Sequence, residues 1–270
     1  MSMMRTSDGV KLHVEEAGEG PPLILIAGLG GVATFWSSIA PNLSRTYRVI
    51  QFDHRGTGRS DRPADGYSVE RIAQDVIEIL DKLNVDSAHV VGHSTGGAVA
   101  QALALDAADR IGRIVLSATW DKADYRFRKL FDTRAAVLEA CGAKVYQDLT
   151  HLMAYQPAWM NDHAEQLDAA SELAADALDP VAVSLARIRM LSAFDRSADI
   201  ACIAAPTMVI GATDDDIVPY YYSERLASTI PNARLVGFTG GHFFPRLHPK
   251  EYADAVAAFL NVSESRTSKP

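Results

Sequence analysis

The chain has 270 residues, of which 48% are hydrophobic and 22% are charged, which is the balance of a globular protein with a sizeable core. Its 26 Lys and Arg against 34 Asp and Glu give a formal net charge of −8, and no basic run interrupts this acidic balance. Nucleic acid and anionic membranes are therefore excluded as expected partners. Cys141 and Cys202 form no CxxC pair, so we expect no disulfide framework. With no apolar run of signal-peptide or membrane-span length, we expect a cytoplasmic protein.

Strand and helix patterns alternate along most of the chain. Residues 10–16 alternate like an edge strand, and residues 22–28 form a short apolar run, typical of a strand buried on both faces. Similar runs predict further strands at 47–52, 88–91, 113–117 and 207–210. Apolar residues at three- and four-residue spacing predict helices at 69–83, with Ser68 as N-cap, and at 98–107. This order predicts an α/β fold, a mostly parallel sheet with helices on both faces.

The alternation stops between about residues 120 and 195, where helical patterns dominate. Because this stretch joins the strands near residues 115 and 208, it enters above the carboxyl ends of the strands, where open α/β sheets bind ligands. We therefore predict a core formed by residues 1–119 and 196–270 and a helical cap formed by residues 120–195. The alternative is that the stretch belongs to the core. Residues 263–270 read as a disordered polar tail.

A candidate nucleophile stands in the run Gly92-His93-Ser94-Thr95-Gly96. This run matches G-x-S-x-G, with an apolar strand pattern before it and a helical pattern after it. Ser94 would occupy a sharp, strained turn, and a side chain at either glycine position would collide with a neighbouring strand or helix. The run therefore predicts a nucleophilic serine. The alternative is a glycine-rich structural turn that merely contains Ser94.

A serine hydroxyl is a weak nucleophile at neutral pH and needs a base within hydrogen-bonding reach. With this motif, the acid and then the histidine follow the serine along the chain. His242 follows an apolar strand pattern that ends in a glycine pair, so it is the predicted base. The acid should end the strand before it, where Asp214, Asp215 and Asp216 compete. We expect Asp216 to cap the turn or face water.

An oxyanion hole is also required for acyl transfer. Its predicted donors are the backbone N–H groups of Thr95, directly after the nucleophile, and of Leu29, in the loop that follows the strand at 22–28. A dinucleotide-binding loop is a weak alternative, because the third glycine and the acidic strand end are missing. The segment 53–61 is interpreted as a structural turn and not as a phosphate loop. His, Asp and Glu do not cluster at ligand spacing, so we expect no metal and no cofactor.

In combination, these motifs resemble the α/β-hydrolase superfamily over nearly the whole chain. The runs that carry the resemblance are Gly28-Leu29-Gly30-Gly31, Asp53-x-Arg55-Gly56-x-Gly58-x-Ser60, Gly92-x-Ser94-x-Gly96-Gly97, Asp215 with Pro219, and Gly240-Gly241-His242. The resemblance implies Asp215, four residues before the proline, as the triad acid, with Asp214 as the runner-up.

Within the superfamily the sequence looks most like small bacterial enzymes of ring-catabolite degradation, which include 3-oxoadipate enol-lactonases and aminoacrylate hydrolases. Phe35-Trp36 and Pro157-Ala158-Trp159-Met160 carry the similarity to the aminoacrylate group. In that group the nucleophile position is not reliably serine, whereas Ser94 stands here in a complete motif, which favours a covalent acyl intermediate. The run at 93–97 is also similar to cofactor-free haloperoxidases.

The resulting hypothesis is a hydrolase of a small carboxylic ester or lactone that works through an acyl-enzyme on Ser94. Trp120, Tyr155 and Trp159 are the predicted pocket residues. The alternatives are an amidase, carbamate or C–C bond hydrolase with the same triad, a cofactor-free perhydrolase, or a ligand receptor with negligible turnover. The expected partner is a small-molecule substrate. The oligomeric state stays open, with a homodimer as one alternative.

Overall fold

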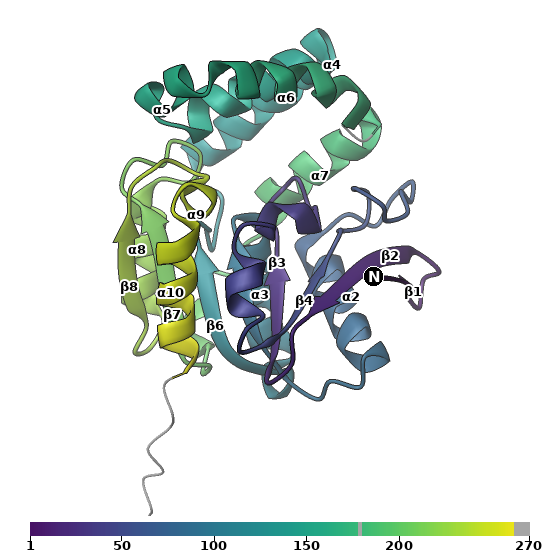
Figure 1. Ribbon diagram of the computed structural model, residues 1–270, viewed down its shortest axis with the longest axis vertical. Helices are drawn as coiled ribbons and strands as arrows, with labels where there is room; N and C mark the ends of the chain where they lie inside the picture. Colours follow the sequence, from purple (N-terminus) through teal and green to yellow (C-terminus); the bar gives the residue numbers. More distant parts are fainter. Residues whose placement is uncertain (178–179, 262–270) are drawn as a thin grey trace, which may run out of the picture.

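A computed structural model describes residues 1–177 and 180–261 of the chain (Figure 1). It contains an eight-stranded sheet in the order β1-β2-β4-β3-β5-β6-β7-β8. The strands are β1 (Ser2–Arg5), β2 (Lys11–Ala17), β3 (Pro22–Ile26), β4 (Arg48–Phe52), β5 (Ala88–His93), β6 (Ile111–Ser117), β7 (Thr207–Ala212) and β8 (Arg234–Phe238). β1 and β2 are antiparallel to their neighbours, and the other pairings are parallel. The predicted fold class is therefore confirmed.

Helices cover both faces of the sheet. The α-helices are α1 (Ala40–Leu43), α2 (Val69–Lys82), α3 (Thr95–Asp106), α4 (Tyr125–Ala154), α5 (Pro157–Asp162), α6 (Ala164–Ala177), α7 (Val181–Ala193), α8 (Tyr220–Thr229), α9 (Phe244–Leu247) and α10 (Pro249–Leu260). Short 3₁₀ turns are η1 (Ala33–Trp36), η2 (Ala108–Arg110) and η3 (Ile200–Cys202). Alternate side chains of the central strands pack against α2, α3 and α8 on one face and against α1 and α10 on the other.

The central strands form where their sequences are continuously apolar. All but the first residue of β3 and every residue of β7 are buried, because helices cover them from both sides. The predicted N-cap is confirmed, since Ser68 Oγ accepts a hydrogen bond from the N–H of Arg71 at 3.0 Å. β1 was not predicted, because this edge strand of four residues is mostly exposed and carries no apolar alternation.

Between β6 and β7 the chain forms α4 to α7, which gather over one end of the sheet (Figure 1). The two ends of this insertion meet, since Lys122 and Asp195 form an isolated β-bridge and an ion pair at 2.8 Å. These helices lie within the segment 120–195 that was predicted to form the cap. That this segment is a separate domain with these boundaries remains a prediction. The predicted tail at 263–270 lies outside the described residues. Within residues 1–177 and 180–261, no helix is both long and apolar enough to cross a bilayer.

Candidate active site

Ser94 occupies the turn between β5 and α3 in a conformation that residues other than glycine rarely adopt, with φ 55° and ψ −116°. The two glycines of the motif make this turn possible. A Cβ at Gly92 would lie 2.1 Å from the carbonyl oxygen of Gly96, and a Cβ at Gly96 would lie 2.0 Å from that of Ile26. The turn is therefore as tight as the motif predicts, and it presents the serine at the end of a central strand.

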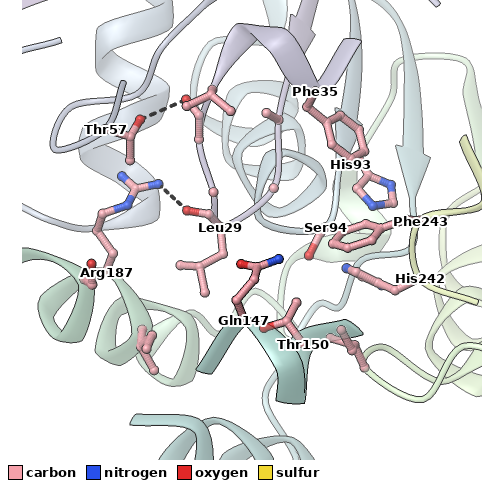
Figure 2. Close-up of a pocket in the computed structure, with 18 of the residues that line it drawn as sticks. Leu29, Phe35, Thr57, His93, Ser94, Gln147, Thr150, Arg187, His242 and Phe243 are labelled. Carbon is pink, nitrogen blue, oxygen red and sulfur yellow. Dashed lines mark hydrogen bonds between the residues drawn. The ribbon is translucent and has the colours of Figure 1, made fainter. Parts of the chain in front are cut away.

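His242 and Asp215 form a buried hydrogen-bonded pair near this turn. The Nδ1 atom of His242 lies 2.7 Å from Oδ2 of Asp215, and each residue is 4% exposed. The other carboxylate oxygen accepts the N–H groups of Ile217 and Val218, each at 2.8 Å. A carboxylate oxygen accepts a hydrogen bond from Nδ1 of His242, so the neutral imidazole has its proton on Nδ1 and a free lone pair on Nε2. Figure 2 shows the His242 ring and the Ser94 hydroxyl pointing toward one another.

The neighbouring aspartates have different roles. Asp214 accepts the N–H groups of Gly240 at 3.0 Å and Gly241 at 3.1 Å, and the side-chain amide of Gln156. Burial raises the pKa of Asp214, but these hydrogen bonds outweigh it and leave the pKa below its usual value. Asp216 is exposed. Of the three aspartates, Asp215 therefore contacts the imidazole, whereas Asp214 fixes the glycine pair that precedes it.

The loop with the predicted oxyanion donor Leu29 is held by polar contacts from other segments (Figure 2). Arg187 of α7 donates to the carbonyl oxygen of Leu29 at 2.8 Å, and Thr57 donates to that of Gly31 at 3.0 Å. The second predicted donor, Thr95, is the first residue of α3, where backbone N–H groups have no acceptor within the helix. Its side chain is fully buried. The oxyanion roles of both N–H groups remain predictions.

Ser94 and His242 line a cavity of about 550 Å³ between the sheet and the cap helices. From the core, Leu29, Phe35 and Phe243 also line it. From the cap, α4 contributes Phe131, Arg134, Tyr146, Gln147 and Thr150, and α7 contributes Arg187 and Ile188. Ser94 and His242 therefore face the same cavity as side chains from the cap.

None of the three predicted pocket residues is among the residues that line this cavity, so that prediction is corrected. Trp120 is fully buried and packs against Phe127, with ring centroids 4.5 Å apart. Tyr155 packs edge-on against Phe243 at 5.3 Å, and Trp159 stacks on Tyr155 at 4.4 Å. Tyr155 and Trp159 thus support the wall that Phe243 forms. Their irregular spacing in the sequence did not reveal which way each ring points.

Arg134 is a lining residue that the sequence analysis missed, although the sequence contains a signal for it. The buried positions along this part of α4 include Phe127, Phe131, Arg134 and Leu138, at spacings of four, three and four residues. This is the spacing of one apolar helix face, and a charged residue within it is unusual.

His93, next to the nucleophile, is a buried and uncharged neighbour of the triad. Its ring stacks on Phe35 at 4.9 Å and lies 5.0 Å from the ring of His242. Its Nδ1 atom lies 3.1 Å from Oγ of Ser117. Burial, and then repulsion from the His242 ring when that ring is protonated, hold the pKa of His93 well below its usual value. Burial also lowers the pKa of His54.

These buried histidines predict a loss of stability in mild acid. Below about pH 6.5, His54 and His93 bind protons in the unfolded chain but not in the folded state. The free energy of unfolding therefore decreases as the pH is lowered. Each histidine should contribute a loss of about 1.4 kcal/mol between pH 7.5 and pH 5.5. Urea denaturation at the two pH values measures it. His93→Asn should reduce the difference by one such amount, and an unchanged difference would contradict the assignment.

The segment at 53–61 has the structural role that the sequence indicated. The carboxylate of Asp53 accepts the N–H groups of Ala33 at 2.8 Å and Arg59 at 2.9 Å. Arg55 donates two hydrogen bonds to Asp75, each 2.7 Å long, which anchors the segment to α2. Among the residues that the structure describes, His, Cys, Asp and Glu side chains form no group of three that could hold a metal ion.

The sheet order and the turn that carries Ser94 define the protein as a hydrolase of the α/β type. The family model of the alpha/beta hydrolase fold matches residues 21–249, and the chain belongs to this family. The resemblance seen in the sequence is therefore confirmed.

Curated relatives carry the name "Putative carbamate hydrolase RutD". The relative from Caulobacter sp. (strain K31) is 36% identical over 260 residues, which covers 95% of this chain and 97% of the relative. The relative from Variovorax paradoxus (strain S110) is 38% identical over 238 residues, or 87% of each chain.

Solved structures with the same fold include a hydrolase from Pseudomonas aeruginosa PA01, with 30% identity and a TM-score of 0.87 over 96% of this chain and 98% of that one. The enol-lactonase from Burkholderia xenovorans LB400 is 25% identical, with a TM-score of 0.88 over 96% of this chain and 99% of that one.

Proposed function

We propose that this protein is a serine hydrolase that cleaves a small carboxylic ester or lactone through an acyl-enzyme on Ser94. The observation that carries the proposal is that Ser94, on its strained turn, lines the same cavity as His242, whose other ring nitrogen is hydrogen-bonded to the buried Asp215. The cavity of about 550 Å³ is of a size that suits a small molecule. The similarity to an enol-lactonase supports the choice of substrate class.

In the first half of the reaction, Nε2 of His242 takes the hydroxyl proton of Ser94 while the serine oxygen attacks the carbonyl carbon. The N–H groups of Leu29 and Thr95 donate to the oxyanion that forms. Asp215 stabilises the imidazolium through Nδ1. The leaving oxygen then takes the proton from His242 as its bond to the acyl carbon breaks.

In the second half, water attacks the acyl carbon and gives a proton to His242, which returns it to the oxygen of Ser94. An ester releases an alcohol in the first half and a carboxylic acid in the second. A lactone keeps its leaving oxygen attached to the acyl group, so the single product is a hydroxy acid. His242 therefore serves as base and acid once in each half, and the enzyme returns to its starting state.

Hydrolysis of a carbamate by the same residues is a second candidate. It is favoured by the name of the curated relatives, which are 36% to 38% identical in the two cases given above. The carbamate carbonyl would be attacked in the same way, with a nitrogen or an oxygen as leaving atom. The amidase and C–C bond alternatives share this triad and differ in the bond that breaks. A perhydrolase would break the same ester bond, but hydrogen peroxide in place of water would then attack the acyl carbon and release a peracid.

A substrate panel tests the proposal. The wild-type protein is assayed with p-nitrophenyl acetate and butyrate, a γ-lactone, an aryl carbamate and a vinylogous ketone. We expect turnover of the esters and the lactone, and an acetyl adduct on the peptide that contains Ser94 after rapid quenching. Turnover of the carbamate alone would favour the second candidate. A stoichiometric burst without turnover would overturn the proposal in favour of a ligand receptor.

A further inference from the structure

We propose that the substrate carries a carboxylate besides the bond that is cleaved, and that Arg134 of the cap helix α4 binds this carboxylate. The inference rests on the proposed function, because it places the carboxylate on the acyl compound that Ser94 attacks. Arg134 and Ser94 line the same cavity, Arg134 from the cap and Ser94 from the core. One molecule can therefore contact both residues at the same time.

Arg134 is a buried cation with no counter-ion among the side chains that the structure describes. Its side chain is among the buried charged groups, with 5% exposure, and none of its contacts within the described part of the chain is an ion pair. Burial lowers the pKa of Arg134. A guanidinium nevertheless stays protonated in proteins. An isolated buried charge strongly destabilises a fold, and an apolar side chain of similar size would avoid this cost. The charge is therefore explained best by a ligand that neutralises it.

The guanidinium is held in place, yet part of its hydrogen-bonding capacity is unused. Its Nη2 atom donates to the hydroxyl groups of Tyr146 at 3.0 Å and Thr150 at 2.9 Å. The rings of Phe131 and Tyr146 lie 5.2 Å and 4.9 Å from its central carbon. Its buried Nε atom has no hydrogen-bond partner among the described residues. A fixed guanidinium with free N–H groups is pre-organised to bind an anion.

The charges around the cavity favour an anion as well. The formal net charge of the chain is −8. Even so, the described residues that line the cavity include Arg134, Arg187 and Arg246 and no Asp or Glu. Arg187 is engaged with backbone carbonyl groups, and Arg246 is exposed. Arg134 is therefore the buried cation that remains for a ligand.

A carboxylate fits this site better than other small anions. The planar guanidinium can donate two parallel hydrogen bonds to the two carboxylate oxygens. The contacts of Arg134 within the site are neutral hydroxyl groups and aromatic rings, so it balances a single negative charge. A phosphate monoester would bring close to two negative charges at neutral pH. The substrate class that follows is a half-ester of a dicarboxylic acid, or a lactone with a carboxylate side chain.

The test compares two esters that differ in one charge. Mono-p-nitrophenyl glutarate carries a terminal carboxylate, and p-nitrophenyl pentanoate has an acyl chain of the same length without it. The readout is the ratio of their kcat/KM values. We expect the wild-type protein to prefer the glutarate half-ester, and Arg134→Met to lower this ratio about 100-fold. Arg189→Met, which removes an exposed charge from α7, is the matched control and should leave the ratio unchanged.

Further variants separate the possible outcomes. Arg134→Lys keeps the charge but not the planar fork, so it should retain an intermediate ratio. If Arg134→Met does not fold, Arg134→Gln takes its place. A wild-type ratio in the Met or Gln variant would overturn the inference, as would loss of the ratio in Arg246→Met with Arg134 intact.

Failure of the proposed function gives a different result. If Ser94→Ala hydrolyses both esters as fast as the wild type, the proposed acyl-enzyme is wrong, whatever Arg134 does. The anion site is then tested by binding alone. Calorimetry with glutarate should show binding to the Ser94→Ala protein and at least about 100-fold weaker binding when Arg134→Met is added. Equal binding to both proteins would refute the role of Arg134.

Discussion

Ser94→Ala is expected to lower kcat for p-nitrophenyl butyrate by at least about 10⁴-fold. Without the hydroxyl, no acyl-enzyme can form, and His242 has no nucleophile to activate. The turn itself should persist, because the positive φ at position 94 is fixed by the close contacts of Gly92 and Gly96. Steady-state kinetics of both proteins measures the effect, and their melting temperatures verify that the variant is folded.

A matched control is available in the same cavity. Ser184 of α7 also lines it, and Ser184→Ala removes an equivalent hydroxyl from the cap instead of from the turn. Ser184→Ala should change kcat by less than about threefold, because its hydroxyl is not the one that attacks the carbonyl carbon. Equal rates for the wild type and Ser94→Ala would show that hydrolysis does not pass through Ser94.

The core of the fold could be read from the sequence because its signals are local. A strand that is buried on both faces needs a continuous apolar run, and β3, β5, β6 and β7 each have one. The turn at Ser94 needs small residues at fixed positions, since even a methyl group at Gly92 would meet the backbone of Gly96. Short-range patterns of this kind survive without knowledge of the tertiary structure.

The cap side of the cavity could not be predicted in the same way. Which ring faces the cavity depends on how α4 to α7 pack against one another and against the core, and contacts between distant segments decide this packing. Trp120 and Phe243 are an example. The Trp120 side chain is fully buried in the core, whereas the Phe243 side chain lines the cavity. For Arg134 the sequence did carry information, because a charge interrupts an otherwise apolar helix face.

The choice among the three aspartates also needed the structure. Their neighbouring positions gave no physical reason to prefer one, and only the family resemblance selected Asp215. In the structure, successive residues of this loop point in different directions, so Asp215 contacts His242 and Asp214 contacts the backbone of the glycine pair. This difference makes a direct experiment possible.

Asp215→Asn is expected to lower kcat about 10⁴-fold. The N–H groups of Ile217 and Val218 would hold the amide oxygen where Oδ1 lies now. The amide NH₂ would then face Nδ1 of His242 at the position of Oδ2. Because this group is a donor, Nδ1 must become an acceptor and the proton moves to Nε2. His242 would be held in the tautomer that cannot accept the proton of Ser94.

Asp214→Asn is the matched control, since it replaces the adjacent carboxylate by the same amide. An amide oxygen can still accept the N–H groups of Gly240 and Gly241, so the loop keeps most of its geometry. We expect kcat to fall by less than about 10-fold, because the tautomer of His242 is unaffected. Measuring kcat of the two variants under the same conditions shows which aspartate is the triad acid. A larger loss in Asp214→Asn than in Asp215→Asn would reverse the assignment, because His242 would then depend on the loop contacts of Asp214 and not on its hydrogen bond to Asp215.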